Sequence, residues 1–288
     1  NLDGTGIGIA VVDSGIFQEH VAFQDQNGRS RQLIGLDLTD SEVESSESDP
    51  YGHGTHVAGM ALGNGKMSSG AYRGIAPNAS LISLRVLDST GKGSVTSVLR
   101  ALAWILDNHL TYNIRVVNLS LGAAAIDSYV NDPVCKAVRK LVDSGIVVIA
   151  AAGNNGKDAD GIKTYGVIHS PGNEPSAITV GASNGMGTDT RSDDRVASYS
   201  SRGPTRSYWT DGAGVRHHDN IVKPDLVAPG NRLISAAAER SSLLAAHPEL
   251  NANVSQSLER RMMFMSGTSV SAPVVAGAAA LILQANPG

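Results

Sequence analysis

The chain alternates short apolar runs with helical patterns, and this alternation constrains its fold more than any other feature. Each run is flanked by Gly, Asn or Asp, which is typical of a strand buried on both faces of a parallel sheet. The runs cover residues 7–12, 81–86, 116–119, 146–151 and 178–182. Because helical patterns separate them, the sequence predicts an α/β fold: a three-layer, doubly wound, mostly parallel sheet with helices on both faces.

The helical patterns have recognisable ends. Residues 53–62 and 94–108 form two of them, and a third, 133–144, begins at Pro133 and stops before Gly145. Residues 272–283 are almost entirely apolar, so we expect a buried helix that is too short to span a membrane. Residues 37–50, 63–73 and 202–220 read as loops, and a short helical pattern lies around 243–250. With no repeat and no linker, we expect one domain over residues 1–288.

Charge and cysteine content exclude several classes of protein. The 288 residues carry a formal net charge of −4 and no long basic block, which argues against nucleic-acid binding. The single cysteine, Cys135, cannot form an internal disulfide and is expected to be a small buried residue. The first residues are polar and rich in Gly, without the features of a signal peptide.

Polar residues follow two of the predicted strands, where sites form in doubly wound sheets. Asp13 ends the first strand, where it could cap a turn or act as a functional carboxylate. Asn154 follows the strand at 146–151, where its side-chain amide could donate to an oxyanion or the residue could occupy a left-handed turn. Neither residue is decisive alone.

Two histidines stand at the start of the helical pattern 53–62. His53 lies between two glycines, which allow close approach of other groups, and His56 follows three residues later. A zinc site would need a third ligand and, for catalysis, usually a Glu, and no Glu lies between the histidines or in the helix. We therefore expect a structural role for His56. His217, His218 and Asp219 form a second, weaker metal candidate.

Ser269 lies near the start of the apolar helix. Free N–H groups and the helix dipole favour developing negative charge at such a position. A serine there can equally serve as the N-cap, and Ser266, Thr268 and Ser271 could fill that role instead.

The combination of motifs is more specific than any one residue. VVDSG, HGTHVAG, SLG, AAGNNG and GTSVSAP occur in the order and approximate spacing of the subtilase family, which the chain resembles from about Gly6 to Asn286. The resemblance implies a serine endopeptidase. It implies that Asp13 is the triad aspartate, His53 the general base and Ser269 the nucleophile, with Asn154 in the oxyanion hole. The chain order Asp, His, Ser distinguishes this family from other serine hydrolases.

The same resemblance assigns the substrate-binding segments. A substrate peptide is expected to pair as an added strand between the segments 91–93 and 120–122. The segment 151–153 is expected to form one wall of the S1 pocket with small, uncharged residues. Broad specificity with an apolar or aromatic P1 residue follows. Lys92 could favour acidic substrate residues or could simply be exposed. The expected residues are Gly91, Lys92 and Gly93 on one edge, Ser120, Leu121 and Gly122 on the other, Ala151, Ala152 and Gly153 in the wall, and Asn155 at its rim.

Cofactors and partners are also implied by the resemblance. Catalysis needs no cofactor, while structural Ca²⁺ is typical of the family. Residues 63–73 lack the Asn-rich calcium loop of secreted subtilisins and resemble the AprX-type branch, which leaves loops 157–175 and 185–194 as calcium candidates. The expected partners are protein and peptide substrates and the protein's own prodomain, as inhibitor and chaperone. We expect a secreted monomer, in mature form, with no nucleic-acid or membrane partner.

Three other functions compete with this interpretation. Gly4–Gly8 resembles a dinucleotide-binding fingerprint, but these glycines precede the strand, whereas a phosphate loop must follow it. A catalytically inactive subtilase acting as a binding protein is disfavoured by the complete set Asp13, His53, Asn154 and Ser269. A peptide ligase or esterase stays open, because water and amines compete for the same acyl-enzyme.

Overall fold

The centre of the molecule is an eight-stranded sheet. The computed structural model describes residues 2–25, 27–39, 48–68 and 70–287. Seven strands follow the order β12-β8-β6-β4-β1-β3-β2 and pair in parallel, and β9 joins β8 antiparallel. The strands are β1 (Gly8–Asp13), β2 (Gln32–Asp37), β3 (Ser80–Arg85), β4 (Ile114–Leu119), β6 (Val147–Ala151), β8 (Ile178–Asn184), β9 (Arg195–Val196) and β12 (Leu226–Pro229).

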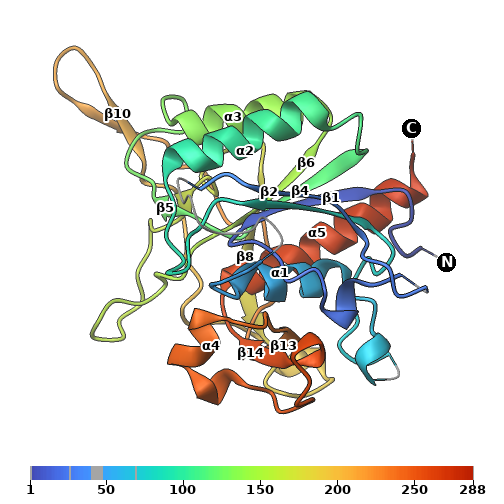
Figure 1. The fold of residues 1–288 in the computed structure, drawn as a ribbon. Helices are drawn as coiled ribbons and strands as arrows, with labels where there is room; N and C mark the ends of the chain where they lie inside the picture. Colours follow the sequence, from blue (N-terminus) through green and yellow to red (C-terminus); the bar gives the residue numbers. More distant parts are fainter. Residues whose placement is uncertain (1, 26, 40–47, 69, 288) are drawn as a thin grey trace.

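Helices cover both faces of this sheet (Figure 1). One core cluster joins Ile9 and Val11 of β1 to α1 (His53–Leu62) and α5 (Thr268–Ala285). The opposite cluster joins Ala10 and Val12 to α2 (Val95–Asn108) and α3 (Pro133–Asp143). Alternate residues of one strand thus face opposite layers, as the period of a β-strand requires. The predicted three-layer α/β fold is confirmed.

Local signals explain why the helix bounds agree closely with the prediction. Ser94 caps α2 by accepting a hydrogen bond from the Ser97 N–H at 3.0 Å. Asp132 caps α3, Pro133 occupies its first turn, and Gly145 follows its end with a φ of 84°. α1 matches the predicted 53–62, while α5 begins at Thr268, earlier than the predicted 272.

The outer parts of the fold differ from the prediction. Strands β2 and β12, both at the sheet edges, were not predicted. Gly35 interrupts the apolar residues of β2, and the apolar run of β12 is short, mostly exposed and ends at Pro229. The predicted loop 202–220 contains the hairpin of β10 (Tyr208–Thr210) and β11 (Arg216–His218). β13 (Leu233–Ala236) pairs with β14 (Met262–Met265), and the short helical pattern becomes α4 (Ser242–Ala246) and a 3₁₀ turn at Pro248–Leu250. Much of the predicted loop 37–50 lies outside the described residues.

Helix α5 packs against α1 and strands β4, β6 and β8. With 18 residues and a mean hydropathy of 1.5, it is long and apolar enough to cross a membrane by length and composition. Its contacts with the sheet and α1 account for the same composition in a core helix. The sequence run alone underestimated its length because the first turn, from Thr268, is polar.

Strand order places a crevice at the centre of the sheet. The chain runs from β1 to the edge strand β2, returns to β3 between these two strands, and then crosses to β4 on the other side of β1. The direction of winding therefore reverses around β1. Ligands in open α/β sheets bind at such a reversal, outside the carboxyl ends of the strands. Asp13 ends β1, and Ser120 directly follows β4.

Candidate active site

Asp13 is held rigidly at the end of β1. Its side chain is almost completely buried, and the Ser14 N–H donates to its Oδ1 at 2.8 Å. Its backbone carbonyl accepts hydrogen bonds from Val86 and Leu87, which follow the neighbouring strand β3. The carboxylate therefore has one orientation available to it.

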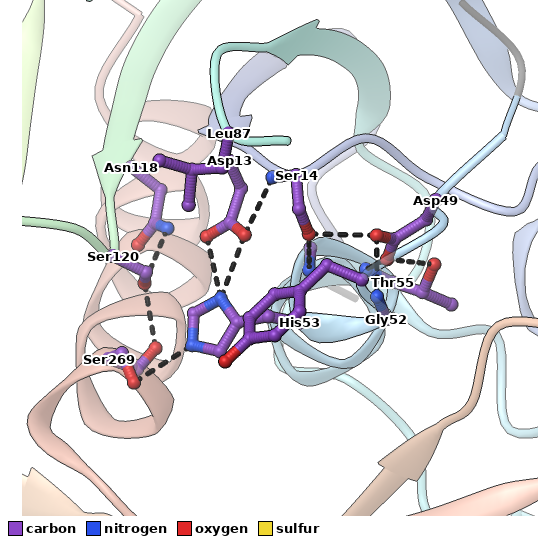
Figure 2. A network of polar contacts seen from close by, with 12 residues as sticks. Asp13, Ser14, Asp49, Gly52, His53, Thr55, Leu87, Asn118, Ser120 and Ser269 are labelled. Carbon is purple, nitrogen blue, oxygen red and sulfur yellow. Dashed lines mark hydrogen bonds and ion pairs between the residues drawn. The ribbon is translucent and has the colours of Figure 1, made fainter. Parts of the chain in front are cut away.

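His53, the first residue of α1, lies between Asp13 and Ser269 (Figure 2). Its Nδ1 is 2.8 Å and 3.0 Å from the two carboxylate oxygens of Asp13, and its Nε2 is 3.0 Å from Ser269 Oγ. Because the carboxylate only accepts, Nδ1 carries the proton in the neutral ring. Nε2 is then left with a lone pair directed at the serine hydroxyl.

Opposing effects act on the pKa of His53. Burial favours the neutral ring and lowers the pKa, but the charge of Asp13 and its hydrogen bond favour the imidazolium, and Asp49 adds a further negative charge. The net result is a pKa raised above its ordinary value. The ring can thus take a proton from a neighbouring hydroxyl and be stabilised once charged.

Ser269 is the second residue of α5, where N–H groups have no acceptor within the helix. Pro273, four residues later, has no N–H to offer the Ser269 carbonyl, so this helical hydrogen bond is missing. Ser120 Oγ donates to that carbonyl instead at 2.7 Å and accepts from Asn118 Nδ2 at 2.9 Å. The proline thereby lets the end of β4 hold the serine in place (Figure 2).

Asn154 is oriented by the same helix start. Its Oδ1 accepts hydrogen bonds from the Thr268 N–H at 2.9 Å and the Thr268 hydroxyl at 3.1 Å, which leaves Nδ2 as the outward group. A Cβ added at Gly267 would lie 3.0 Å from Ser269 Oγ and 3.3 Å from Asn154 Nδ2, so both atoms face one small space. The left-handed residue of this turn is Gly153, with a φ of 103°.

A second carboxylate, Asp49, organises the back of the site (Figure 2). It is buried and accepts four hydrogen bonds: to Oδ1 from Ser14 Oγ at 2.8 Å and Gly52 N at 2.7 Å, and to Oδ2 from Thr55 N and Thr55 Oγ1, both at 2.7 Å. Ser14 Oγ also accepts from Gly54 N at 2.9 Å. Asp49 therefore ties the residue after Asp13 to both sides of His53. Burial raises the pKa of Asp49, and the four donors oppose that shift.

The two glycines beside His53 are required by close contacts. A Cβ at Gly54 would lie 2.2 Å from the Gly15 carbonyl oxygen and 3.2 Å from Asp13 Cβ. Gly52 has a φ of 97°, and a Cβ there would lie 2.1 Å from Ser241 Oγ. The Gly15 backbone and the Ser241 side chain, rather than substrate, fill the space that these glycines leave.

The site opens into a cleft of about 860 Å³. Ala152 does not line it as expected: this residue is completely buried, since alternation along the chain turns Ala151 and Gly153 toward the cleft. Tyr51 lines the cleft with its ring 6.3 Å from that of His53, and His169 lines it as well; we did not predict either. The other expected residues all line it: Gly91, Lys92, Gly93, Ser120, Leu121, Gly122, Ala151, Gly153 and Asn155, together with His53, Asn154 and Ser269.

No group of three or more His, Cys, Asp or Glu side chains that could hold a metal occurs within the described residues. His56 is buried, its Nε2 lies 3.2 Å from the Leu233 carbonyl, and burial lowers its pKa to about 3. The expected structural role of His56 is therefore confirmed. In the second metal candidate, His217 pairs with Asp211, while Asp219 accepts from Ser128 and Ser207.

The calcium candidate loops present no such group either. Asp158 Oδ1 accepts the N–H groups of Asp160 and Ile162, and both carboxylate oxygens of Asp193 accept from Thr188. These side chains stabilise their own turns as arranged, and they do not fit a carboxylate-rich calcium site.

Known proteins are similar to this chain in sequence and in fold. The chain is 37% identical over 294 residues to the serine protease AprX of Bacillus subtilis (strain 168), covering 99% of this chain and 59% of that protein. It is 32% identical over 284 residues to an extracellular serine proteinase of Thermus sp. (strain Rt41A), covering 99% of this chain and 52% of the relative. The chain thus spans less than two thirds of the length of either protein.

A solved structure, described as the S41 psychrophilic protease, superimposes with a TM-score of 0.71 at 30% sequence identity, covering 99% of this chain and 79% of that one. The model of the subtilase family, Peptidase_S8, matches residues 4–288. The motifs, the fold and these similarities agree, and the chain belongs to the subtilase family.

Proposed function

We propose that this protein is a serine endopeptidase whose triad is Asp13, His53 and Ser269. One observation carries the proposal: the continuous hydrogen-bonded path from the Asp13 carboxylate through both nitrogens of His53 to Ser269 Oγ, which opens into the cleft. Nucleophile, base and orienting group are within hydrogen-bonding reach of one another, as covalent catalysis requires.

The reaction follows from these positions. Ser269 Oγ attacks the peptide carbonyl carbon while His53 Nε2 takes the hydroxyl proton, and Asp13 stabilises the imidazolium. The oxyanion accepts hydrogen bonds from Asn154 Nδ2 and the Ser269 N–H. The C–N bond then breaks as Nε2 returns the proton to the leaving amine. Water then attacks the resulting ester while Nε2 takes its proton. The bond between the acyl carbon and Ser269 Oγ breaks, and Nε2 returns the proton to Oγ, which frees the acid product and restores the serine.

The cleft suits an extended peptide. Gly91–Gly93 and Ser120–Gly122 offer backbone on two sides of the lining, so a substrate can add as a strand between them. Ala151 and Gly153 give one wall of the S1 pocket, and Asn155 lies at its rim. Small, uncharged walls support broad specificity with an apolar or aromatic P1 residue.

The biological setting is proposed from the relatives. The name of the Thermus relative supports secretion, and the net charge of −4 accords with protein rather than nucleic-acid substrates. We propose a monomeric catalytic domain that is inhibited and assisted in folding by its own prodomain. Any calcium would be structural, and a site in loops 157–175 or 185–194 would depend on backbone carbonyls.

Casein hydrolysis tests the proposal. The native protein should cleave casein, whereas treatment with phenylmethylsulfonyl fluoride or the substitution Ser269→Ala should abolish cleavage. The matched variant Ser266→Ala should stay active, because Ser266 lies outside the triad and its Oγ accepts a hydrogen bond from the Arg232 N–H of a neighbouring loop. Equal hydrolysis by native, inhibitor-treated and Ser269→Ala protein would exclude a serine protease.

A further inference from the structure

His169 lines the cleft and lies next to Gly122 on one wall and Gly153 on the other. It belongs to β7 (His169–Ser170), whose pairing with β5 (Ala123–Ala124) sets His169 opposite Ala124. On the other side its N–H donates to the Ala152 carbonyl at 3.0 Å. The backbone of this residue is therefore fixed to the segment after Gly122 and to the segment before Gly153.

The imidazole touches both walls directly. A Cβ added at Gly153 would lie 2.8 Å from Cγ and Cδ2 of the His169 ring, and one added at Gly122 would lie 3.1 Å from His169 Cβ. Both glycines line the same cleft as Ser269 and Asn154. A substrate side chain that enters between these walls must meet the His169 ring.

The ring is also available for a ligand. The chain has eight histidines, and seven make a ring hydrogen bond to a described residue. Within the described part of the chain, the His169 ring makes none, although the residue is half-buried and its backbone is ordered by two hydrogen bonds. A rigid, half-buried imidazole with unused polar atoms is suited to bind a polar group.

We infer that His169 selects P1 side chains that end in an uncharged hydrogen-bonding group, such as glutamine or tyrosine, over apolar side chains of similar shape. This inference rests on the proposed endopeptidase function and revises its P1 preference: the small walls alone favour apolar or aromatic side chains, and the His169 ring adds a preference for a polar terminus among side chains of similar shape. A site that hydrogen-bonds its ligand discriminates against an analogue without that group, because the protein atom is then left unpaired.

The charge of the surroundings specifies a neutral partner. Burial lowers the pKa of His169, so near pH 7 the ring is neutral and offers one donor and one acceptor. Asp127 and Asp132 line the same cleft, which also contains the ammonium group of Lys92, and this excess of carboxylates disfavours an acidic P1 side chain. A carboxamide or a phenol, each with donor and acceptor capacity, complements the ring.

Matched peptide pairs test the inference. Succinyl-Ala-Ala-Pro-X-p-nitroanilides with X as Gln or Met, and as Tyr or Phe, differ mainly in the terminal polar group. In the native enzyme kcat/KM should be higher for the polar member of each pair. His169→Phe keeps a planar ring without polar nitrogens and should lower both ratios about two- to tenfold, the range expected for one hydrogen bond. His169→Gln, which keeps a donor and an acceptor, should retain a higher Gln-to-Met ratio than His169→Phe.

The ratio of two kcat/KM values on one sample does not depend on the fraction of active enzyme, so partial misfolding does not obscure the result. His169→Ala provides a second variant without ring nitrogens and should also lose both preferences. A purely structural role of His169 would change kcat/KM for both peptides of a pair alike. The inference is therefore overturned if the ratios are unchanged in His169→Phe or His169→Ala, whichever is active. Failure of the native enzyme to cleave any of the four peptides would instead count against the proposed function.

Discussion

Replacing Asp49 by Asn tests whether this second carboxylate organises the site. Each Asp49 oxygen accepts one backbone N–H, from Gly52 at Oδ1 and from Thr55 at Oδ2. An Asn side chain has only one acceptor oxygen, so in either orientation its NH₂ group faces a backbone donor. Adjacent hydroxyls of Ser14 and Thr55 can rotate to accept, but the N–H of Gly52 or Thr55 cannot.

The cost can be worked out from this geometry. One buried N–H without a partner destabilises the fold by about 1–3 kcal/mol. In a domain of this size, 1 kcal/mol lowers the melting temperature by about 2 °C, so Asp49→Asn should melt about 2–6 °C lower. The substitution also removes a negative charge that raises the pKa of His53, so the acidic limb of the kcat/KM profile should move to lower pH.

Calorimetry in a Ser269→Ala background measures the first effect without self-cleavage, and peptide hydrolysis from pH 5 to 9 measures the second in the active enzyme. Asp158→Asn is the matched control. This exposed carboxylate accepts two N–H groups at the same oxygen, so an Asn keeps both bonds. If Asp49→Asn has the same melting temperature as Asp158→Asn and leaves the pH profile unchanged, the proposed role of Asp49 is wrong.

Three further predictions concern the reacting groups. Asn154→Leu should lower kcat with little change in KM, since loss of the corresponding donor in subtilisin lowers kcat about 10²–10³-fold. Steady-state kinetics on one peptide would measure both constants, and a change in KM alone would contradict the prediction. His53 must be neutral to act as base and its pKa is raised, so kcat/KM should rise with pH around a pKa above that of ordinary imidazole. Asp13→Asn should shift this rise to lower pH; an unshifted pH profile would refute the pairing of Asp13 with His53. Ser120→Ala removes the donor to the Ser269 carbonyl and should destabilise the Ser269→Ala protein by about 1–3 kcal/mol, measured by denaturant unfolding, whereas an unchanged midpoint would show that the bond contributes nothing.

The interior of the fold was predictable because its signals are local. Central strands carry continuous apolar runs, and α2 and α3 begin at side-chain caps in the sequence. The apolar run of edge strand β2 is interrupted by Gly35, and that of β12 is short and mostly exposed. The hairpin β10–β11 depends on pairing between short, mainly polar segments. The family assignment was also predictable and is confirmed, because the five motifs occur together in one order.

The site was only partly predictable. Asp13 and Ser269 taken alone resemble turn and cap residues, and their motifs indicated a catalytic set. Asp49 precedes His53 by four residues, but its bond to Ser14 spans 35 positions, which no local pattern reveals. His169 reaches the cleft through the pairing of β7 with β5, 45 positions away in register, in a segment without periodicity. Such contacts are set by tertiary structure.

Labelling of the nucleophile tests the central claim most directly. A fluorophosphonate should react once per molecule, and peptide mapping by mass spectrometry should locate the adduct on Ser269 with complete loss of activity. His53→Ala, which leaves Ser269 in place but removes the base 3.0 Å from its Oγ, should react far more slowly. An adduct on another residue, or equally fast labelling of His53→Ala, would contradict the Asp13–His53–Ser269 mechanism.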